Sequence, residues 1–211
     1  MATTVRKPEA QRSETATAAI RPPVTLRLRP AIDLTPDLLL DLSRLNPELR
    51  FELTAEGELI VMSPSGWESG HQNAGITALL WLWADRDGTG AVSDSSTLFE
   101  LPNKAVRSSD AAWVTNARLA AIPTEQRRKQ LPLCPDFVIE LRSPTDRLPA
   151  LQDKMREYMD NGARLGWLID PDHKRVYVYH PEIPVQQLDN PETLSADPVL
   201  TGFVLDLRKV W

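Results

Sequence analysis

Apolar residues along the chain are spaced with two different periods, and the changes of period indicate where helices and strands begin and end. In three stretches they recur at every third or fourth position, which predicts amphipathic helices over about 36–45, 68–84 and 147–161. Thr35 precedes a proline and an acid at the start of the first helix, which is a helix-start signature. The last helix is predicted to be capped within Ser143–Asp146 and to have Tyr158 among its apolar positions. Gly162 follows this helix, at the position where a glycine commonly ends one.

Short runs rich in β-branched and aromatic residues predict strands between these helices. The turn at Gly57 predicts a hairpin of Arg50–Thr54 with Glu58–Met62. Further strands are predicted at Ala91–Ser93, Thr97–Leu101, Ala105–Val114, Pro135–Leu141, Leu165–Asp170, Arg175–Tyr179 and Phe203–Leu207. The proline-containing stretch from Pro181 to Pro198 is predicted to be irregular. Hairpins and strand–helix–strand units together predict an α/β fold with a mixed β-sheet flanked by helices.

The length of 211 residues favours one domain, and a hydrophobic content of 42% is enough for a sizeable core. Residues 1–23 are polar and proline-containing, so we predict a disordered N-terminal tail followed by a domain over residues 24–211. The single cysteine, Cys134, excludes an internal disulfide, and we expect it to be buried. No apolar stretch suits a membrane span or a secretory signal, so we expect a cytoplasmic protein.

Three polar residues carry the candidate chemistry. Asp110 lies within a predicted strand, where an acid costs desolvation energy unless it is paired or binds a metal. Glu140 ends the apolar run Phe137–Ile139, and Lys154 lies three residues after Leu151 on the following helix, at the border of its apolar stripe. Two carboxylates suit a hard cation such as Mg²⁺, and a nearby lysine can position or deprotonate the attacking water. This combination predicts phosphodiester hydrolysis.

A different interpretation of the same residues needs no metal. Asp110 would cap a turn, and both acids would be solvated at a sheet edge. Glu140 would pair with Lys154 or with Arg142, which lies two residues later and therefore on the same face of the strand. The formal net charge of −5 argues against diffuse nucleic-acid binding, although a metal and a local basic groove can supply a positive field. Spacing alone leaves the two interpretations open.

An ordered set of short segments adds a family resemblance. The segments are Met62-Ser-Pro-Ser65, Leu101-Pro-Asn103 with Arg107-Ser-Ser-Asp110, Pro135-Asp-Phe-Val-Ile-Glu140 with Ser143-Pro144, Lys154-Met-Arg-Glu-Tyr158, and Asn161-Gly162 through Gly166-Trp-Leu-Ile-Asp-Pro171. In this order they resemble the Uma-two family of the PD-(D/E)XK nuclease superfamily, and the similarity runs from about Leu34 to the C-terminus. The resemblance implies a restriction-endonuclease-like fold and a Mg²⁺-dependent DNA endonuclease, with Mn²⁺ as a possible substitute.

The resemblance also assigns residues to the site. Asp110 and Glu140 match the two acids of the family, and a backbone carbonyl near Leu141 would complete the metal coordination. Arg142 stands where the superfamily usually has a lysine, and arginine is a poor base because it stays protonated. Lys154 matches the family's lysine on the next helix, so it is our catalytic cation, and Arg142 is assigned to phosphate contact or structure.

Other residues are candidates for the rim of the site. Glu52, on the first hairpin, is a possible further acid and otherwise a solvated strand residue. His71 near the start of the second helix either contacts substrate or is a surface or packing residue. The basic run Arg127–Lys129 is interpreted as a solvated loop rather than a backbone contact. Four tryptophans are predicted to pack in the core, with base stacking as the alternative: Trp81, Trp83, Trp113 and Trp167.

Three functional hypotheses follow. The first is a metal-dependent DNA endonuclease that uses Asp110, Glu140 and Lys154. The second is a nuclease-fold module that binds nucleic acid or a protein without cleaving it. The third is a partner that acts through a homodimer interface, to which the strand Arg175–Tyr179 would contribute an exposed edge.

Overall fold

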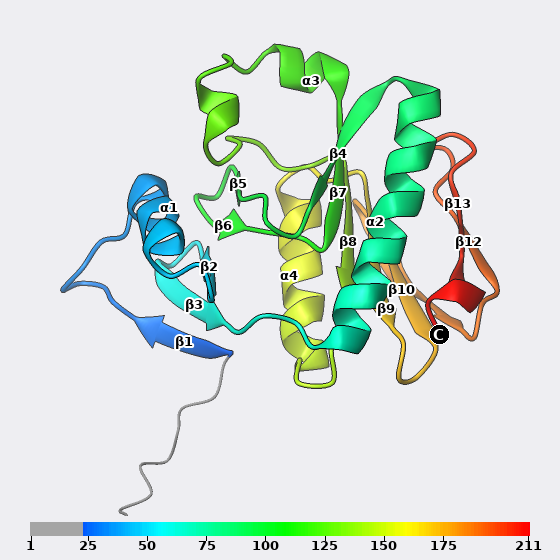
Figure 1. The fold of residues 1–211 in the computed structure, drawn as a ribbon, viewed down its shortest axis with the longest axis horizontal. Helices are drawn as coiled ribbons and strands as arrows, with labels where there is room; N and C mark the ends of the chain where they lie inside the picture. Colours follow the sequence, from blue (N-terminus) through cyan, green and yellow to red (C-terminus); the bar gives the residue numbers. More distant parts are fainter. Residues whose placement is uncertain (1–22) are drawn as a thin grey trace, which may run out of the picture.

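The computed structural model describes residues 23–211 and has the predicted α/β architecture (Figure 1). The predicted tail lies outside the described residues, apart from Pro23. In chain order the first half contains β1 (Val24–Arg27), α1 (Pro36–Leu45), β2 (Arg50–Leu53), β3 (Glu58–Met62), α2 (Trp67–Asp87), β4 (Gly90–Asp94), β5 (Phe99–Glu100), β6 (Val106–Arg107), β7 (Ala111–Thr115) and α3 (Asn116–Ala120). The second half contains η1 (Gln126–Arg128), β8 (Phe137–Leu141), α4 (Leu148–Asp160), β9 (Leu165–Asp170), β10 (Arg175–His180), β11 (Ile183–Asp189), β12 (Thr193–Ser195), β13 (Val204–Asp206) and η2 (Leu207–Lys209). No helix within residues 23–211 is long and apolar enough to cross a membrane.

The larger sheet is mixed, as the sequence predicts. Its strand order is β11-β10-β9-β8-β7-β4, and the β8–β9 pair is parallel while the other neighbours are antiparallel. The parallel pair is joined by α4, which is the crossover helix that a parallel connection requires. β8 and β9 are buried along their whole length, which explains why their sequences are continuous apolar runs rather than alternating ones.

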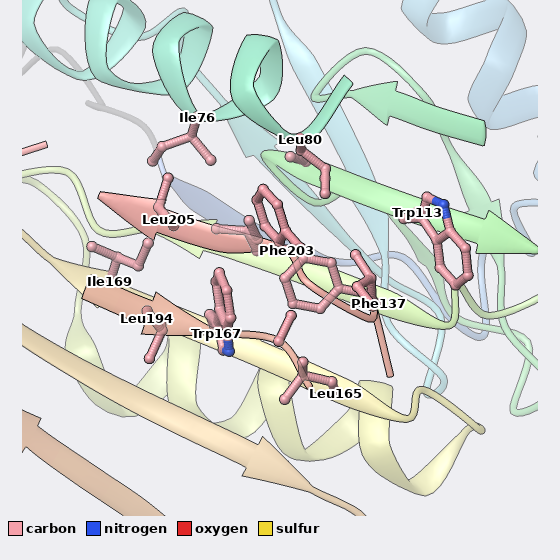
Figure 2. Packing of buried hydrophobic residues seen from close by; sticks show 14 of the residues in the cluster. Ile76, Leu80, Trp113, Phe137, Leu165, Trp167, Ile169, Leu194, Phe203 and Leu205 are labelled. Carbon is pink, nitrogen blue, oxygen red and sulfur yellow. The ribbon is translucent and has the colours of Figure 1, made fainter. Parts of the chain in front are cut away.

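The side chains of β8 alternate between the two faces of this sheet, and each face has its own core. Phe137, Ile139 and Leu141 belong to a core under α2, which contributes Ile76 and Leu80 (Figure 2). In this core Phe137 meets Trp167 edge to face at a centroid distance of 4.8 Å, an arrangement that adds about 1 kcal/mol to the burial itself.

The opposite face of the sheet packs against α4. Val138 of β8 shares this core with Met155 and Tyr158 of α4. Glu140 has the same parity as Val138, so it also points toward α4. The alternation that buries the apolar residues of β8 therefore places its carboxylate beneath the helix that carries Lys154.

The second sheet is antiparallel and lies beside the first. Its order is β1-β3-β2-β6-β5, and α1 packs against it through Leu39. The predicted cap is confirmed, because Thr35 Oγ1 accepts a hydrogen bond from the backbone N–H of Leu38 at 3.2 Å. Gly57 has a φ of +84° in the turn between β2 and β3, a conformation that favours glycine.

Four details of the sequence-based prediction are wrong. Ala105–Val114 is not one strand, since β6 and β7 belong to different sheets and Ser108–Asp110 connects them. The Pro181–Pro198 stretch is not irregular, because it contains β11 and β12. The third error follows from this: the strand Arg175–Tyr179 was predicted to have an exposed edge, but β10 is an interior strand and β11 lies at the edge.

The fourth concerns the start of α4. The prediction put a helix cap within Ser143–Asp146, but the residue that caps α4 is Arg147, without a side-chain hydrogen bond. The carboxylate of Asp146 instead accepts hydrogen bonds from the backbone and the hydroxyl of Ser143.

Candidate active site

A pocket of about 480 Å³ opens where the two sheets meet the N-terminal ends of α2 and α4. Its charged lining residues include Glu52, Asp110, Glu140 and Lys154, which come from different parts of the fold. Leu141, the start of α2 and the turn Ser143–Asp146 complete the wall. The pocket therefore brings together residues that are separated by up to about a hundred positions in the sequence.

Lys154 is the centre of the polar contacts in this pocket. Its Nζ lies 2.7 Å from Glu52 Oε1, 2.9 Å from Glu140 Oε1 and 2.7 Å from the carbonyl oxygen of Ser108. The helical periodicity of α4 explains the placement, because Lys154 lies four positions before the buried Tyr158 and so on the face that covers the sheet. Three acceptors occupy the three donor positions of the ammonium group.

The charge of Lys154 is stabilised by these neighbours. Burial by itself would lower the pKa of the ammonium group, but the carboxylates of Glu140 and Glu52 raise it above its ordinary value. Lys154 is therefore protonated at neutral pH. A role as the base that removes a proton from water does not fit this arrangement.

Glu52 links the pocket to a second buried cation. Its Oε2 lies 3.2 Å from Arg107 Nη1, and its Oε1 accepts a hydrogen bond from the backbone N–H of Ser108 at 3.1 Å. Burial opposes ionisation of Glu52, yet the positive charges of Lys154 and Arg107 hold its pKa below the ordinary value. Arg107 also pairs with Glu157 of α4 at 2.5 Å, so this network joins α4 to the second sheet.

Asp110 occupies the crossing between the two sheets, immediately before β7. Its Oδ2 accepts a hydrogen bond of 2.8 Å from the backbone N–H of Leu141, the residue after Glu140. This bond holds the two carboxylates next to each other. Burial raises the pKa of Asp110, although the Leu141 hydrogen bond and the charge of Lys154 act in the opposite direction.

Glu140 has the most perturbed acidity of the three acids. Burial is the largest cause, the negative charges of Asp110 and Glu52 add to it, and Lys154 opposes them, which together bring the pKa to about 8. The hydroxyl of Tyr158 also donates to Glu140 Oε1, at 3.4 Å. Burial and the neighbouring carboxylates thus favour the protonated form of Glu140 in the metal-free protein.

The donor set fits a divalent cation that prefers oxygen ligands. Asp110 Oδ1 and Glu140 Oε2 accept no hydrogen bond from residues 23–211, and both residues line the pocket. The described residues contain no group of three or more His, Cys, Asp or Glu that could hold a metal by themselves. A cation here would accordingly need backbone or water oxygens as well, which is usual for Mg²⁺.

Two residues that the sequence suggested for substrate contact lie elsewhere. Arg142 is not part of the pocket wall, because its guanidinium binds Asp170 at 2.7 Å. Asp170, the last residue of β9, is buried and also contacts His173. His71 does not line the pocket either, and its ring stacks against that of Trp67.

The structure also adds residues that the sequence did not point to. Tyr158 was interpreted as apolar core, but its hydroxyl contacts Glu140. Arg107 was part of a quoted motif without a role, and it is a buried partner of Glu52. The available signal was the position of Arg107 within an apolar run, because an arginine is rarely buried without an anionic partner.

The fold of this chain is similar to that of a solved structure. A crystal structure from Anabaena variabilis, titled as that of "a putative nuclease belonging to DUF820", superimposes with a TM-score of 0.69 at 17% sequence identity. The match covers 84% of this chain and 97% of the other. At this identity the likeness shows the fold alone, and it confirms the predicted fold class.

Proteins with curated descriptions give no match to this chain. The model of the Uma2 family, which is the Uma-two family of the sequence analysis and is described as "Putative restriction endonuclease", matches residues 36–208. That range contains both sheets except β1 and includes Glu52, Asp110, Glu140 and Lys154. The chain therefore belongs to the Uma2 family.

Proposed function

We propose that this protein is a divalent-metal-dependent DNA endonuclease whose active site is the pocket around Lys154. The observation that carries the proposal is the convergence of Glu52, Asp110 and Glu140 on one buried lysine, with one oxygen of Asp110 and one of Glu140 left without a donor among the described residues. Family membership and a nuclease-like fold support the same activity. Because fold alone does not specify chemistry, the proposal depends on the site.

The proposed metal ligands are Asp110, Glu140 and the backbone carbonyl of Leu141. A bound Mg²⁺, or Mn²⁺ in its place, would polarise a phosphoryl oxygen and make a bound water more acidic. Asp110 and Glu140 would be ionised in that state, because a nearby cation lowers the pKa of a carboxyl. The hydrogen bond from Leu141 keeps the Asp110 carboxylate turned toward Glu140.

Lys154 has two functions in this proposal. Its contacts to Glu52 and Glu140 fix the position of the metal-binding acid, and its positive charge favours the negative charge that develops on the phosphate during attack. Orientation of the attacking water by Lys154, which the sequence suggested, would require one of its three contacts to open. Arg142 is left out of the substrate contacts because it is paired with Asp170.

Metal binding and DNA cleavage test the proposal separately. Calorimetric titration with Mg²⁺ or Mn²⁺ should show a site in the wild type that is lost in Asp110→Asn. The matched control is Asp172→Asn, an exposed acid at the turn before β10, which should bind metal like the wild type. Plasmid and oligonucleotide DNA should be cut by the wild type and by the control, but not by Asp110→Asn or Lys154→Met.

A second candidate function is a nuclease-fold module that binds without cutting. The engagement of all three Lys154 donor positions favours it, as does the net charge of −5. Wild-type protein that binds metal and DNA but leaves every DNA substrate intact would support this function. Absence of metal binding in the wild type would rule out the metal-dependent nuclease.

The homodimer and the cytoplasmic location remain predictions. At this end of the larger sheet the edge strand is β11, not the interior β10. β11 is exposed along most of its length, with Ile183 and Val185 among its exposed apolar residues. Sedimentation of the purified chain tests whether it is a dimer.

A further inference from the structure

Trp67 is a large apolar side chain in an unusual position at the rim of the candidate active site. It is 81% exposed, although it lines the same pocket as Asp110 and Glu140. Its indole ring lies nearly parallel to the ring of His71, with a centroid distance of 6.0 Å and an interplanar angle of 8°. His71 therefore supports one face of the indole, and the rest of the ring is available to a ligand.

The charge around the pocket points to a ligand that is not held mainly through its phosphates. The two cations of the wall, Arg50 and Lys154, are outnumbered by the acids there. Lys154 is fully engaged, and Arg50 donates to Ser95 Oγ at 2.7 Å. Duplex DNA is usually bound through many contacts of Lys and Arg with phosphates, which this wall does not offer.

A second hollow continues the pocket along the side of α2 that faces Arg50 and the end of β4 at Asp94. Its volume is about 690 Å³, and it shares Arg50 and Ser65 with the first pocket. Trp81 lines it and is 53% exposed, which corrects the expectation that this tryptophan belongs to the core. Figure 1 shows α2 running across one face of the larger sheet.

The two exposed tryptophans are spaced along one side of the helix. Fourteen residues separate Trp67 from Trp81, which corresponds to roughly 21 Å along the axis and a rotation within about 40° of the same side. That distance matches about six stacked nucleotides at ~3.4 Å each. Aromatic side chains stack on the faces of bases only where those faces are not covered by a neighbouring base or partner strand.

We infer that α2 is a binding track for single-stranded DNA, with Trp67 stacking a base next to the active site and Trp81 stacking a base farther along the strand. The inference rests on the proposed nuclease function, because it names unpaired DNA as the substrate of that site. Stacking supplies most of the affinity on this track. Binding is accordingly less sensitive to salt than binding by a basic groove.

Binding without cleavage gives the direct test. Fluorescein-labelled oligo-dT and a duplex of equal length are titrated with the Asp110→Asn protein in EDTA, and anisotropy is measured at low and moderate salt. Affinity for oligo-dT should exceed that for the duplex and should rise with length up to about six nucleotides. Trp67→Ala should weaken oligo-dT binding roughly tenfold, while Trp67→Phe retains most of it.

The control removes an exposed apolar side chain from a distant edge. Ile183→Ala, at a residue 60% exposed on β11, should leave oligo-dT binding unchanged. Circular dichroism of each variant checks that it is folded. Replacement of Trp67 should not disturb the fold, because this side chain is exposed.

Each outcome separates this inference from the nuclease proposal. If wild-type protein cuts no DNA but binds oligo-dT in a Trp67-dependent way, the track stands and the catalytic proposal fails. If the protein cuts DNA while Trp67→Ala and Trp81→Ala bind like the parent, the track is refuted and the nuclease stands. Equal binding of duplex and oligo-dT also refutes it. The track is also refuted if Trp67→Ala or Trp81→Ala changes the sedimentation of the DNA-free chain, because α2 would then be a protein interface.

Discussion

Lys154→Met tests whether the centre of the site is an electrostatic unit. The substitution keeps an unbranched side chain of similar length and removes the ammonium group, whose side chain is only 12% exposed. Glu52 retains Arg107 and Ser108, but Glu140 loses its only cationic partner among the described residues. Removal of one partner from a buried ion pair costs about 3–5 kcal/mol of unfolding free energy. For a chain of this size that equals roughly 10 °C in the melting temperature.

The loss should depend on pH and on Glu140. Glu140 in the variant escapes part of the penalty by binding a proton, so the destabilisation should be larger at alkaline pH than at acidic pH. Urea unfolding of wild type and Lys154→Met on both sides of pH 8 measures this difference. The double variant Lys154→Met with Glu140→Gln should recover part of the stability, because no uncompensated charge remains.

A matched lysine provides the control. Lys129 pairs with Asp37 at 3.2 Å on the surface, where ion pairs contribute little. Lys129→Met should therefore stay close to the wild type at every pH. A loss below about 1 kcal/mol in Lys154→Met, or an equal loss in both variants, would refute the electrostatic argument.

Two further predictions concern groups with shifted pKa values. The pKa of Glu140 is raised to about 8 in the folded metal-free protein. Between the ordinary pKa of 4.5 and this value the folded state therefore binds more protons than the unfolded state, so the free energy of unfolding should fall as pH rises through this window. Glu140→Gln should flatten this pH dependence, as measured by urea unfolding. Burial raises the pKa of the Cys134 thiol to about 12, so a thiol reagent at pH 8 should modify it only after unfolding, and rapid modification of native protein would contradict its placement.

Local sequence was enough to predict most elements of this fold. Thr35 caps α1 as the pattern indicated, and Gly162, with a φ of +105°, follows the end of α4. The apolar run of β8 is buried as a central strand. These features depend on interactions between residues close in the chain, or on burial of an entire face, so they leave a signal in a short window.

The candidate acids were also visible in the sequence, but their surroundings were not. The sequence suggested Asp110, Glu140 and Lys154 only with the help of a family resemblance, since acids near strand ends are common. It placed Arg142 beside Glu140 by strand alternation, yet the chain leaves β8 at Leu141 and the guanidinium reaches Asp170. Alternation holds only while a strand continues, and the end of a strand depends on its neighbours.

The sequence by itself determined most of the helices and strands, and it determined that Glu140 lies on the same face of its strand as Val138, because these follow from local backbone geometry. Only the tertiary structure decided that Glu52 and Lys154, 102 positions apart, meet at 2.7 Å, and that Ser108–Asp110 crosses between two sheets. It also decided that Arg107 is a buried partner of Glu52 while Trp81 stays exposed. Contacts of this kind depend on how whole layers pack, and no short stretch of sequence records that packing.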